Sequence, residues 1–246
     1  MVRPIPEDRF ESLLETATQV FLEQGYRRTQ IADVALRVGL SKGSVYTYVE
    51  SKQALFDQVL RHADRLDRIG LPESLPVATP SPGATLELLR RRLAEEGTLP
   101  SLTRALSRGR VVDVRAELET VLGELYDALA RHRTAIKLLD RCARDYPELA
   151  KVWYRGGRQG ALELLGRYLD ERARRGRLRR FEDGAVAARI ALETLVFWAV
   201  HRHWDPSPQA IDDEAARRIV LDFVARALLH PIRAGSRRGP GQTSAA

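Results

Sequence analysis

Apolar residues recur at intervals of three and four along most of this 246-residue chain, and no segment sustains the two-residue alternation of a half-buried strand. The first apolar stripe lies between residues 7 and 24 and stops at Gly25, a residue type that often ends a helix. Its members are Phe10, Leu13, Leu14, Ala17, Val20 and Phe21. We therefore expect an all-α fold in which helices pack against helices.

Two short helical segments follow the first one. Residues 30–38 present one apolar face and end at Gly39, and residues 41–48 begin at Ser41, a good N-cap residue. Ser51 can cap a further helix directly after them. Two short helices joined by a turn that contains glycine are typical of a helix-turn-helix, so we identify this pair as one.

The second helix of this pair has an outer face suited to DNA. Apolar Leu40 and Val45 are expected to hold it against the first helix. The residues left to point outward are rich in hydrogen-bond donors and include no carboxylate: Lys42, Gly43, Ser44, Thr47 and Tyr48. Lysine is rare in this arginine-rich chain, yet Lys42 begins this helix and Lys52 begins the next. Such a face fits a major groove, and the cations supply phosphate contacts.

Residues 25–56, GYRRTQIADVALRVGLSKGSVYTYVESKQALF, resemble the DNA-binding head of the TetR family of bacterial transcriptional regulators. The shared pattern includes a Gly-aromatic pair and the segments GLSKGSVY and SKQAL, without gaps. Two positions depart from the family. Gln30 stands where Ser or Thr is usual, which leaves capping and phosphate contact at that helix to Thr29, and Val49 replaces a usual Phe.

The resemblance also implies which residues contact DNA. Those in or along the major groove are Lys42, Ser44, Thr47 and Tyr48. Those that contact phosphates are Thr29, Tyr46 and Lys52, with Arg37 on the exposed face of the preceding helix as a further candidate. No cofactor follows from the resemblance.

The domain organisation follows from the same patterns. Residues 1–62 form the expected helix-turn-helix DNA-binding domain, and residues 70–83, rich in proline and glycine, predict a linker or a long loop. Residues 63–232 form a helical domain to which the resemblance assigns dimerisation and effector binding. Residues 233–246 have the composition of a disordered tail.

Members of this family dimerise through C-terminal helices, so the last two helical segments, about 184–203 and 212–230, are the candidates for a homodimer interface. The first segment carries on one face Leu192, Leu195, Val196 and Ala199. The second carries Ile219, Val220, Phe223, Val224 and Ala227. Two helices from each subunit fit a four-helix contact. The alternative is that one of these helices belongs to the ordinary monomer core.

The family commonly encloses a small-molecule pocket, so the resemblance implies an effector, whose identity the sequence does not give. Aromatic residues at helical spacing, Tyr126, Trp153 and Tyr154, either line such a cavity or fill it. Both interpretations stay open, and ligand-binding residues are left unassigned.

Enzymatic motifs are lacking in the sequence. His201 and His203 are two residues apart on an expected helix, so they point to different faces, and no nearby carboxylate or cysteine completes a metal site. The single Cys142 cannot form an intramolecular disulfide, and the apolar runs fall short of the roughly 20 residues that span a bilayer. We expect a cytoplasmic protein that is not an enzyme, binds no cofactor and does not associate with a membrane.

These observations predict a ligand-responsive regulator, chiefly a repressor that binds a palindromic operator as a homodimer and leaves it when a small-molecule effector binds. An activator of the same fold is an open alternative. A different class is a basic helical protein that binds membrane surfaces or nucleic acid nonspecifically through residues 171–180 and the tail. The net charge of +7 does not decide between a regulator and a nonspecific basic protein, because residues 1–62 carry as many acidic as basic side chains.

Overall fold

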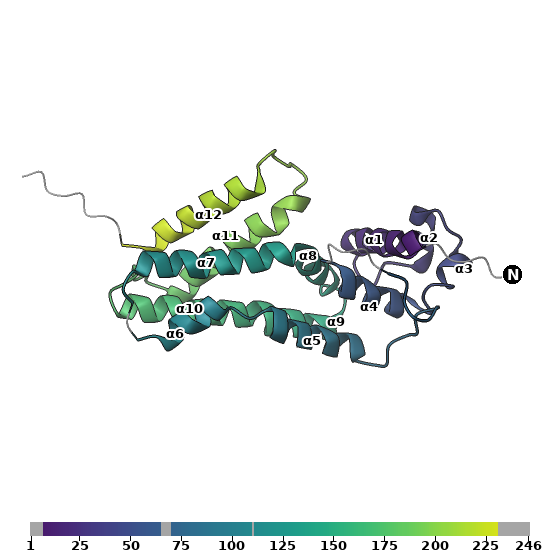
Figure 1. Cartoon of the computed structure of the whole chain (residues 1–246), viewed down its shortest axis with the longest axis horizontal. Coiled ribbons are helices and arrows are strands. Elements are labelled where there is room, and N and C mark those ends of the chain that lie inside the picture. Colours follow the sequence, from purple (N-terminus) through teal and green to yellow (C-terminus); the bar gives the residue numbers. More distant parts are fainter. Residues whose placement is uncertain (1–6, 65–69, 110, 231–246) are drawn as a thin grey trace, which may run out of the picture.

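The computed structural model describes residues 7–64, 70–109 and 111–230, which form helices and the loops between them (Figure 1). The helices of the first half are α1 Glu7–Gln24, α2 Ile31–Val38, α3 Lys42–Val45, α4 Lys52–His62, α5 Ala84–Glu96, α6 Pro100–Ser107 and α7 Val114–Arg131. Those of the second half are α8 Arg133–Cys142, α9 Pro147–Ala150, the π-helix Lys151–Arg158, α10 Gln159–Arg174, α11 Gly184–Ala199, the 3₁₀ turn His201–Trp204 and α12 Asp213–Leu228. The expected tail, residues 233–246, lies outside the described residues.

The all-α prediction is confirmed. Within the described residues, β-type pairing is limited to one bridge between Val49 and Val77. That bridge anchors the loop expected as a linker, because Val77 N donates to Tyr48 O at 2.8 Å and Glu50 N donates to Val77 O at 3.0 Å. Leu71, Leu75 and Val77 of this loop therefore pack on helices α1–α4, which we call the head.

Capping residues set the helix boundaries in the head. Ser41 and Ser51 each accept a hydrogen bond from the backbone N–H three residues further on, at 3.0 and 3.1 Å. Gly39 follows α2 in the left-handed conformation, with a φ of 71°. One element is shorter than predicted, because α3 ends at Val45 and residues 46–48 form a turn.

A break at His132 separates α7 from α8. The backbone of His132 has a φ of −104° and a ψ of 24°, outside the helical range. Asp64, just after α4, caps the new helix, because its Oδ1 accepts from Thr134 N at 3.0 Å and from Ala135 N at 3.1 Å. The cap comes from a distant part of the chain, so local periodicity does not reveal it.

Buried side chains gather into two apolar cores. The first core joins the head to α5, α8, α9 and the π-helix. The second core is formed by α6, α7, α10, α11 and α12. Ile136 of α8 packs against both cores, and Figure 1 shows α8 between α7 and α1. The first core therefore contains residues from both sides of residue 62, where the boundary between the two domains was expected.

The end of α8 and the turn that follows it pack on the end of α1. Arg141 Nη2 donates to Glu23 O at 3.0 Å, and the rings of Tyr26 and Tyr146 stack with their centroids 4.8 Å apart. Gly25 lies beside this contact with a φ of 82°, which glycine adopts without a Cβ clash. The end of the first helix is thus fixed to the rest of the protein by polar and aromatic contacts together.

We predict that Gly25→Ala lowers the free energy of unfolding more than Gly39→Ala. Both glycines have a positive φ, so both substitutions carry backbone strain of about 1–3 kcal/mol. At Gly25 the new Cβ would also lie 2.6 Å from Asp145 Oδ2 and 2.7 Å from Arg141 Nη1, whereas nothing lies within 4 Å at Gly39. Urea unfolding monitored by circular dichroism compares the two variants, and equal losses would contradict the close approach at Gly25.

Candidate nucleic-acid interface and cavity

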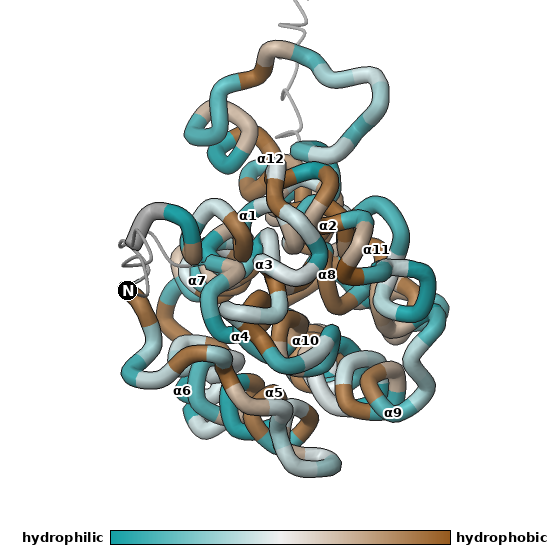
Figure 2. Tube along the Cα trace, turned by 90° about the vertical axis from the view of Figure 1, so that its right-hand side faces the viewer, coloured by the Kyte–Doolittle hydropathy of each residue, from teal (hydrophilic) through white to brown (hydrophobic). Residues whose placement is uncertain are grey.

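Helices α2 and α3 place a small polar face at the end of the molecule that Figure 2 views from the front. Val34 and Val45 are fully buried and hold the two helices in the first core. Lys42 and Thr47 are exposed, and Tyr46 is 41% exposed. Since the four residues of α3 include no carboxylate, this face offers donors and positive charge to a polyanion.

The residues predicted to contact DNA differ in their exposure. The exposed ones are Arg37, Lys42, Tyr46 and Thr47. The partly buried ones are Ser44 and Lys52. The buried ones are Thr29 and Tyr48, at 1% and 5% exposure. The structure thus brings the first group together at the surface and withdraws the last pair from it.

The expectation that Tyr48 points outward is wrong. Its ring stacks on that of Phe10, with centroids 6.2 Å apart, inside the first core. The cause is the length of α3, because the helical projection that put Tyr48 on the outer face holds only as far as Val45. The turn over residues 46–48 instead directs Tyr48 inward.

Thr29 is also part of the interior. Its Oγ1 donates to Gly25 O at 2.7 Å, which closes the turn between α1 and α2. With the side chain buried and its hydroxyl proton engaged, Thr29 shapes this turn instead of presenting a donor at the surface.

Lys52 holds the same turn from the start of α4. Its Nζ donates to Tyr26 O at 3.0 Å and to Arg27 O at 3.3 Å, and it lies 4.8 Å from the centre of the Tyr26 ring. Burial lowers the pKa of Lys52, while the Asp145 carboxylate opposes that shift. The ammonium group therefore ties α4 to the α1–α2 turn.

Arg37 is exposed but paired. Its Nη1 lies 2.7 Å from Glu23 Oε1, and this hydrogen bond lowers the pKa of the Glu23 carboxyl. Ion pairs between exposed side chains contribute little to stability because water screens them. The pair can therefore open at small cost when a phosphate approaches Arg37.

Sequence reasoning missed two exposed arginines beside this face. Arg27 and Arg28 lie in the turn that Thr29 and Lys52 hold in place. The signal that could have found them is their adjacency, since two neighbouring arginines stand next to Thr29 in a head whose acidic and basic side chains balance overall. Their position beside α2 adds positive charge to the edge of the polar face.

A cavity of about 340 Å³ lies where the two apolar cores meet. The first core contributes to its wall Leu60, Leu89 and Leu139. The second core contributes Leu99, Leu125, Leu192 and Val196. Pockets for small molecules typically measure about 300–1,000 Å³ and are mostly apolar. This cavity is therefore large enough for a small ligand.

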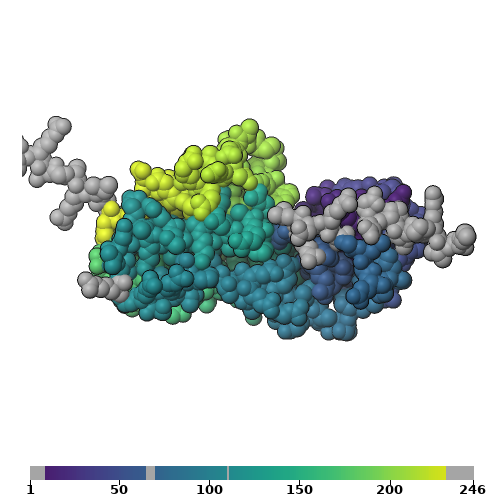
Figure 3. Space-filling view, viewed as in Figure 1, coloured from purple at the N-terminus to yellow at the C-terminus, as the bar shows by residue number. Residues whose placement is uncertain are grey.

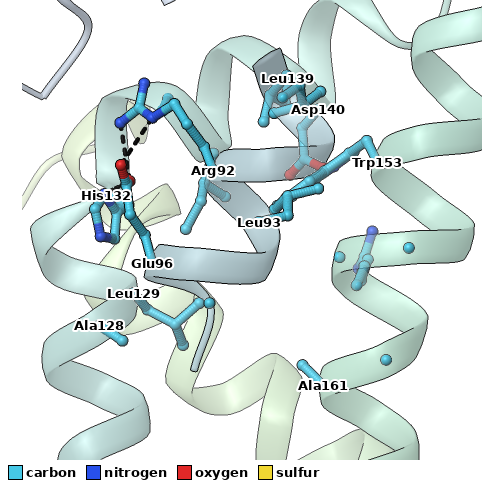
Figure 4. Close-up of a pocket in the computed structure, with 18 of the residues that line it drawn as sticks. Arg92, Leu93, Glu96, Ala128, Leu129, His132, Leu139, Asp140, Trp153 and Ala161 are labelled. Atoms are coloured by element: carbon cyan, nitrogen blue, oxygen red, sulfur yellow. Dashed lines mark hydrogen bonds and ion pairs between the residues drawn. The ribbon is translucent and has the colours of Figure 1, made fainter. Parts of the chain in front are cut away.

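Polar side chains occupy separate places on the cavity wall (Figure 4). At one, Arg92 donates to both carboxylate oxygens of Glu96, at 3.0 and 2.9 Å, and His132 Nδ1 lies 3.6 Å from Glu96 Oε2. At the other, Asp140 Oδ1 accepts from Trp153 Nε1 at 2.6 Å. These groups sit at the edges of an otherwise aliphatic surface.

The aromatic residues considered for a pocket divide between the two open interpretations. Trp153 lines the cavity. Tyr126 is buried in the second core, and Tyr154 packs against the first, where its hydroxyl donates to Asp140 O at 3.3 Å. One aromatic side chain thus lines the cavity and two fill the structure around it.

The outer face of α11 and α12, which stand out from the molecule in Figure 3, carries exposed apolar side chains. They are Val186, Ile190, Phe197, Ile219 and Phe223, each 42–67% exposed. The face of α11 that the sequence suggested is a different one, since its members are buried in the second core: Leu192, Leu195, Val196 and Ala199. Val220 and Val224 of α12 are buried there too. That part of the interface prediction is wrong because α11 is apolar on two faces.

Nowhere in the described ranges do three or more His, Cys, Asp or Glu side chains gather closely enough to hold a metal ion. His201 and His203 fall in the 3₁₀ turn, and burial raises the pKa of the Cys142 thiol to about 12. None of the described helices has the length and apolarity needed to cross a membrane.

Known proteins resemble this chain most clearly across the head. Residues 13–59 match the family described as "Bacterial regulatory proteins, tetR family". The HTH-type transcriptional repressor KstR2 of Rhodococcus jostii (strain RHA1) is 29% identical over 167 residues, which cover 61% of this chain and 81% of that protein. The HTH-type transcriptional repressor DhaR of Mycobacterium sp. (strain GP1) is 43% identical over 51 residues, which cover 21% of this chain and 26% of that protein.

A solved structure extends the likeness to the whole fold. The ketosteroid transcriptional regulator KstR2 of Mycobacterium tuberculosis has a TM-score of 0.52 and 18% sequence identity, over 93% of this chain and 98% of that chain. At this identity the similarity concerns the fold alone. The chain spans most of the Rhodococcus relative but only about a quarter of DhaR, whose match covers the head.

We predict that Thr29→Val lowers the free energy of unfolding by about 1–3 kcal/mol, because it removes the buried hydrogen bond to Gly25 O. Thr47→Val, at an exposed site, is the matched control and should change stability by less than about 0.5 kcal/mol. Urea unfolding measures both. An unchanged stability for Thr29→Val, combined with weaker DNA binding, would instead support the phosphate contact that the resemblance implies.

Proposed function

Because the chain is a member of the TetR family, and so a DNA-binding regulator of transcription and not an enzyme, we propose that it is a repressor of the genes it controls. In this proposal a homodimer binds a palindromic operator through the two heads. A small molecule in the cavity then lowers the affinity for the operator. The relatives described as repressors support the sign of regulation.

The observation that carries the proposal is the exposed polar face of α3 at the end of the head. A helix of this kind reads base edges in the major groove, while flanking cations bind phosphates. We assign base contacts to Lys42, Ser44 and Thr47. Phosphate contacts fall to Tyr46, Arg37, Arg27 and Arg28. Lys52 and Thr29 act indirectly, since they hold the turn that carries the two arginines.

The proposed dimer interface is the exposed apolar face of α11 and α12. Its members recur at helical spacing, and their side chains are exposed in the described part of the subunit. They are Val186, Ile190, Phe197, Ile219 and Phe223. Exposed apolar patches of this kind mark sites of association. A two-fold axis through the face buries the same residues from both subunits, and the resulting pair of heads matches a palindrome.

The position of the cavity supports an effector role for its occupant. Helix α8 lines it with Leu139 and Asp140, and the next residue, Arg141, donates to Glu23 O at the end of α1. Helix α4, which begins at Lys52 in the head, contributes Leu60 to the same wall. An occupant that displaces either helix therefore moves the head, and the spacing of two heads determines operator affinity.

The class of nonspecific basic proteins finds less support in the structure. Arg172, in the basic stretch over residues 171–180, is fully buried and pairs with Glu117 at 2.7 Å. Arg175 pairs with Glu171 at 2.7 Å. The stretch is thus partly engaged in internal ion pairs and does not form a free polycationic surface.

We predict that Thr47→Ala and Lys42→Ala reduce the preference for operator over random DNA, whereas Tyr46→Ala weakens binding to both equally, by about tenfold. The reason is that groove contacts read sequence and phosphate contacts do not. Fluorescence anisotropy with an operator selected from a genomic library measures both affinities. Lys151→Ala, an exposed lysine of the π-helix, is the control and should leave both unchanged. Full affinity in all three head variants would refute the proposed DNA-binding face.

We predict that Phe223→Glu separates the dimer, because it buries a carboxylate in an apolar contact made by both subunits. The dimer dissociation constant, measured by sedimentation velocity, should rise by roughly a hundredfold or more. Val112→Glu is the matched control, since Val112 is 95% exposed and precedes α7, so it is not part of α11 or α12. A dimer that survives Phe223→Glu would place the interface elsewhere.

A further inference from the structure

The wall of the cavity indicates the chemical class of its ligand. We propose that the effector is an uncharged aliphatic molecule, and this inference rests on the proposed function because it concerns the same cavity. Two observations carry it: the composition of the wall and the ion pairs and hydrogen bonds that already engage the charged groups on the wall.

The wall is formed mainly by branched aliphatic side chains from both cores. In addition to those named above, they include Leu88, Leu93, Leu129, Ile136 and Leu164. Trp153 is the one Phe, Tyr or Trp side chain among the described lining residues, and its indole N–H is already bonded to Asp140. Gly156 and Gly157 of the π-helix and Gly160 at the start of α10 add bare backbone to the wall. This surface offers dispersion contacts to an aliphatic ligand and little aromatic stacking.

The cationic and anionic groups near His132 compensate one another. Arg92 makes two hydrogen bonds to Glu96 and a third, from Nη1, to Leu60 O at 2.6 Å. His132 Nδ1 lies 3.6 Å from Glu96 and equally far from Asp64 Oδ2. The hydrogen bond from Arg92 lowers the pKa of Glu96, so this carboxyl stays ionised beside its partner.

The second guanidinium group on the wall is engaged in the same way. Arg158 Nη2 donates to both carboxylate oxygens of Glu193, each at 2.8 Å. Glu193 also binds Arg189 at 2.7 Å, on the same helix α11. A ligand carboxylate would therefore have to displace Glu193 to reach Arg158.

A charged ligand loses its hydration on entering the cavity, and the charged groups on the described wall already have partners. A carboxylate would compete with Glu96 or Glu193. An ammonium group would compete with Arg92 or Arg158, or at Asp140 with the Trp153 N–H and with His201, whose Nε2 lies 3.5 Å from Asp140 Oδ2. An uncharged molecule of the same shape avoids both costs and keeps the apolar contacts. The ion pairs thus select against charge while the aliphatic wall favours hydrocarbon.

The test compares 1-decanol, decanoate and decylammonium, which share one hydrocarbon chain and differ in charge. Isothermal titration of the full chain should show 1-decanol binding at least tenfold more tightly than either ion. Ala161→Leu places a larger side chain on the cavity wall and should abolish binding of 1-decanol. Ala94→Leu, at an exposed position of α5 outside the wall, is the matched control and should bind as the natural chain does.

Glu193→Gln should increase the affinity for decanoate, which a cavity without ion pairs on its wall would not show. The variant keeps the shape of the side chain but releases the charge of Arg158, so decanoate should bind at least tenfold more tightly than it does to the natural chain. Decanoate binding as tightly as 1-decanol to the natural chain would overturn the inference, as would a failure of 1-decanol to bind. Operator release is measured separately by fluorescence anisotropy. Tight binding of 1-decanol without release would uphold the ligand class and refute its role as an effector.

Discussion

The arrangement of the molecule depends on the contact that the end of α8 and the turn after it make with the end of α1. Arg141 donates to the Glu23 carbonyl, Tyr146 stacks on Tyr26, and Gly25 permits the close approach between them. Beneath these contacts, buried residues of α8 and of the head belong to one apolar core. The head is therefore continuous in packing with half of the remaining helices. Its orientation follows that of α8.

The cavity is important because α8, which makes this contact with α1, also lines it. It lies between the core that contains the head and the core that contains α11 and α12, and α8 runs along its wall. Close-packed cores resist compression, so an occupant that does not fit the resting cavity shifts whole helices. Asp64 strengthens this connection, because it follows α4 and caps α8. Helix α8, which contributes to the cavity wall, is thus joined directly to α4 of the head, which contributes to the same wall.

The sequence predicted what local pattern determines and missed what distant contacts determine. The helical class, the head and the caps at Ser41 and Ser51 all follow from spacing within a few residues. The break at His132 depends on a cap from Asp64, which lies far away in the chain. The buried face of α11 could not be chosen, because periodicity shows two apolar faces and only packing decides between them. Tyr48 was misplaced since α3 is one turn shorter than its pattern suggests.

The two lysines of the head illustrate how packing divides residues that the sequence treats alike. Each begins a helix after a capping serine, and each fits a phosphate contact by position. In the fold, Lys42 stays exposed, while the ammonium of Lys52 lies between the carbonyls of Tyr26 and Arg27. A compact ammonium can serve two carbonyls and an aromatic face at once, which a planar guanidinium does less readily. Lys52 thereby orients the turn that carries the exposed arginines, so its charge contributes to the proposed interface through them.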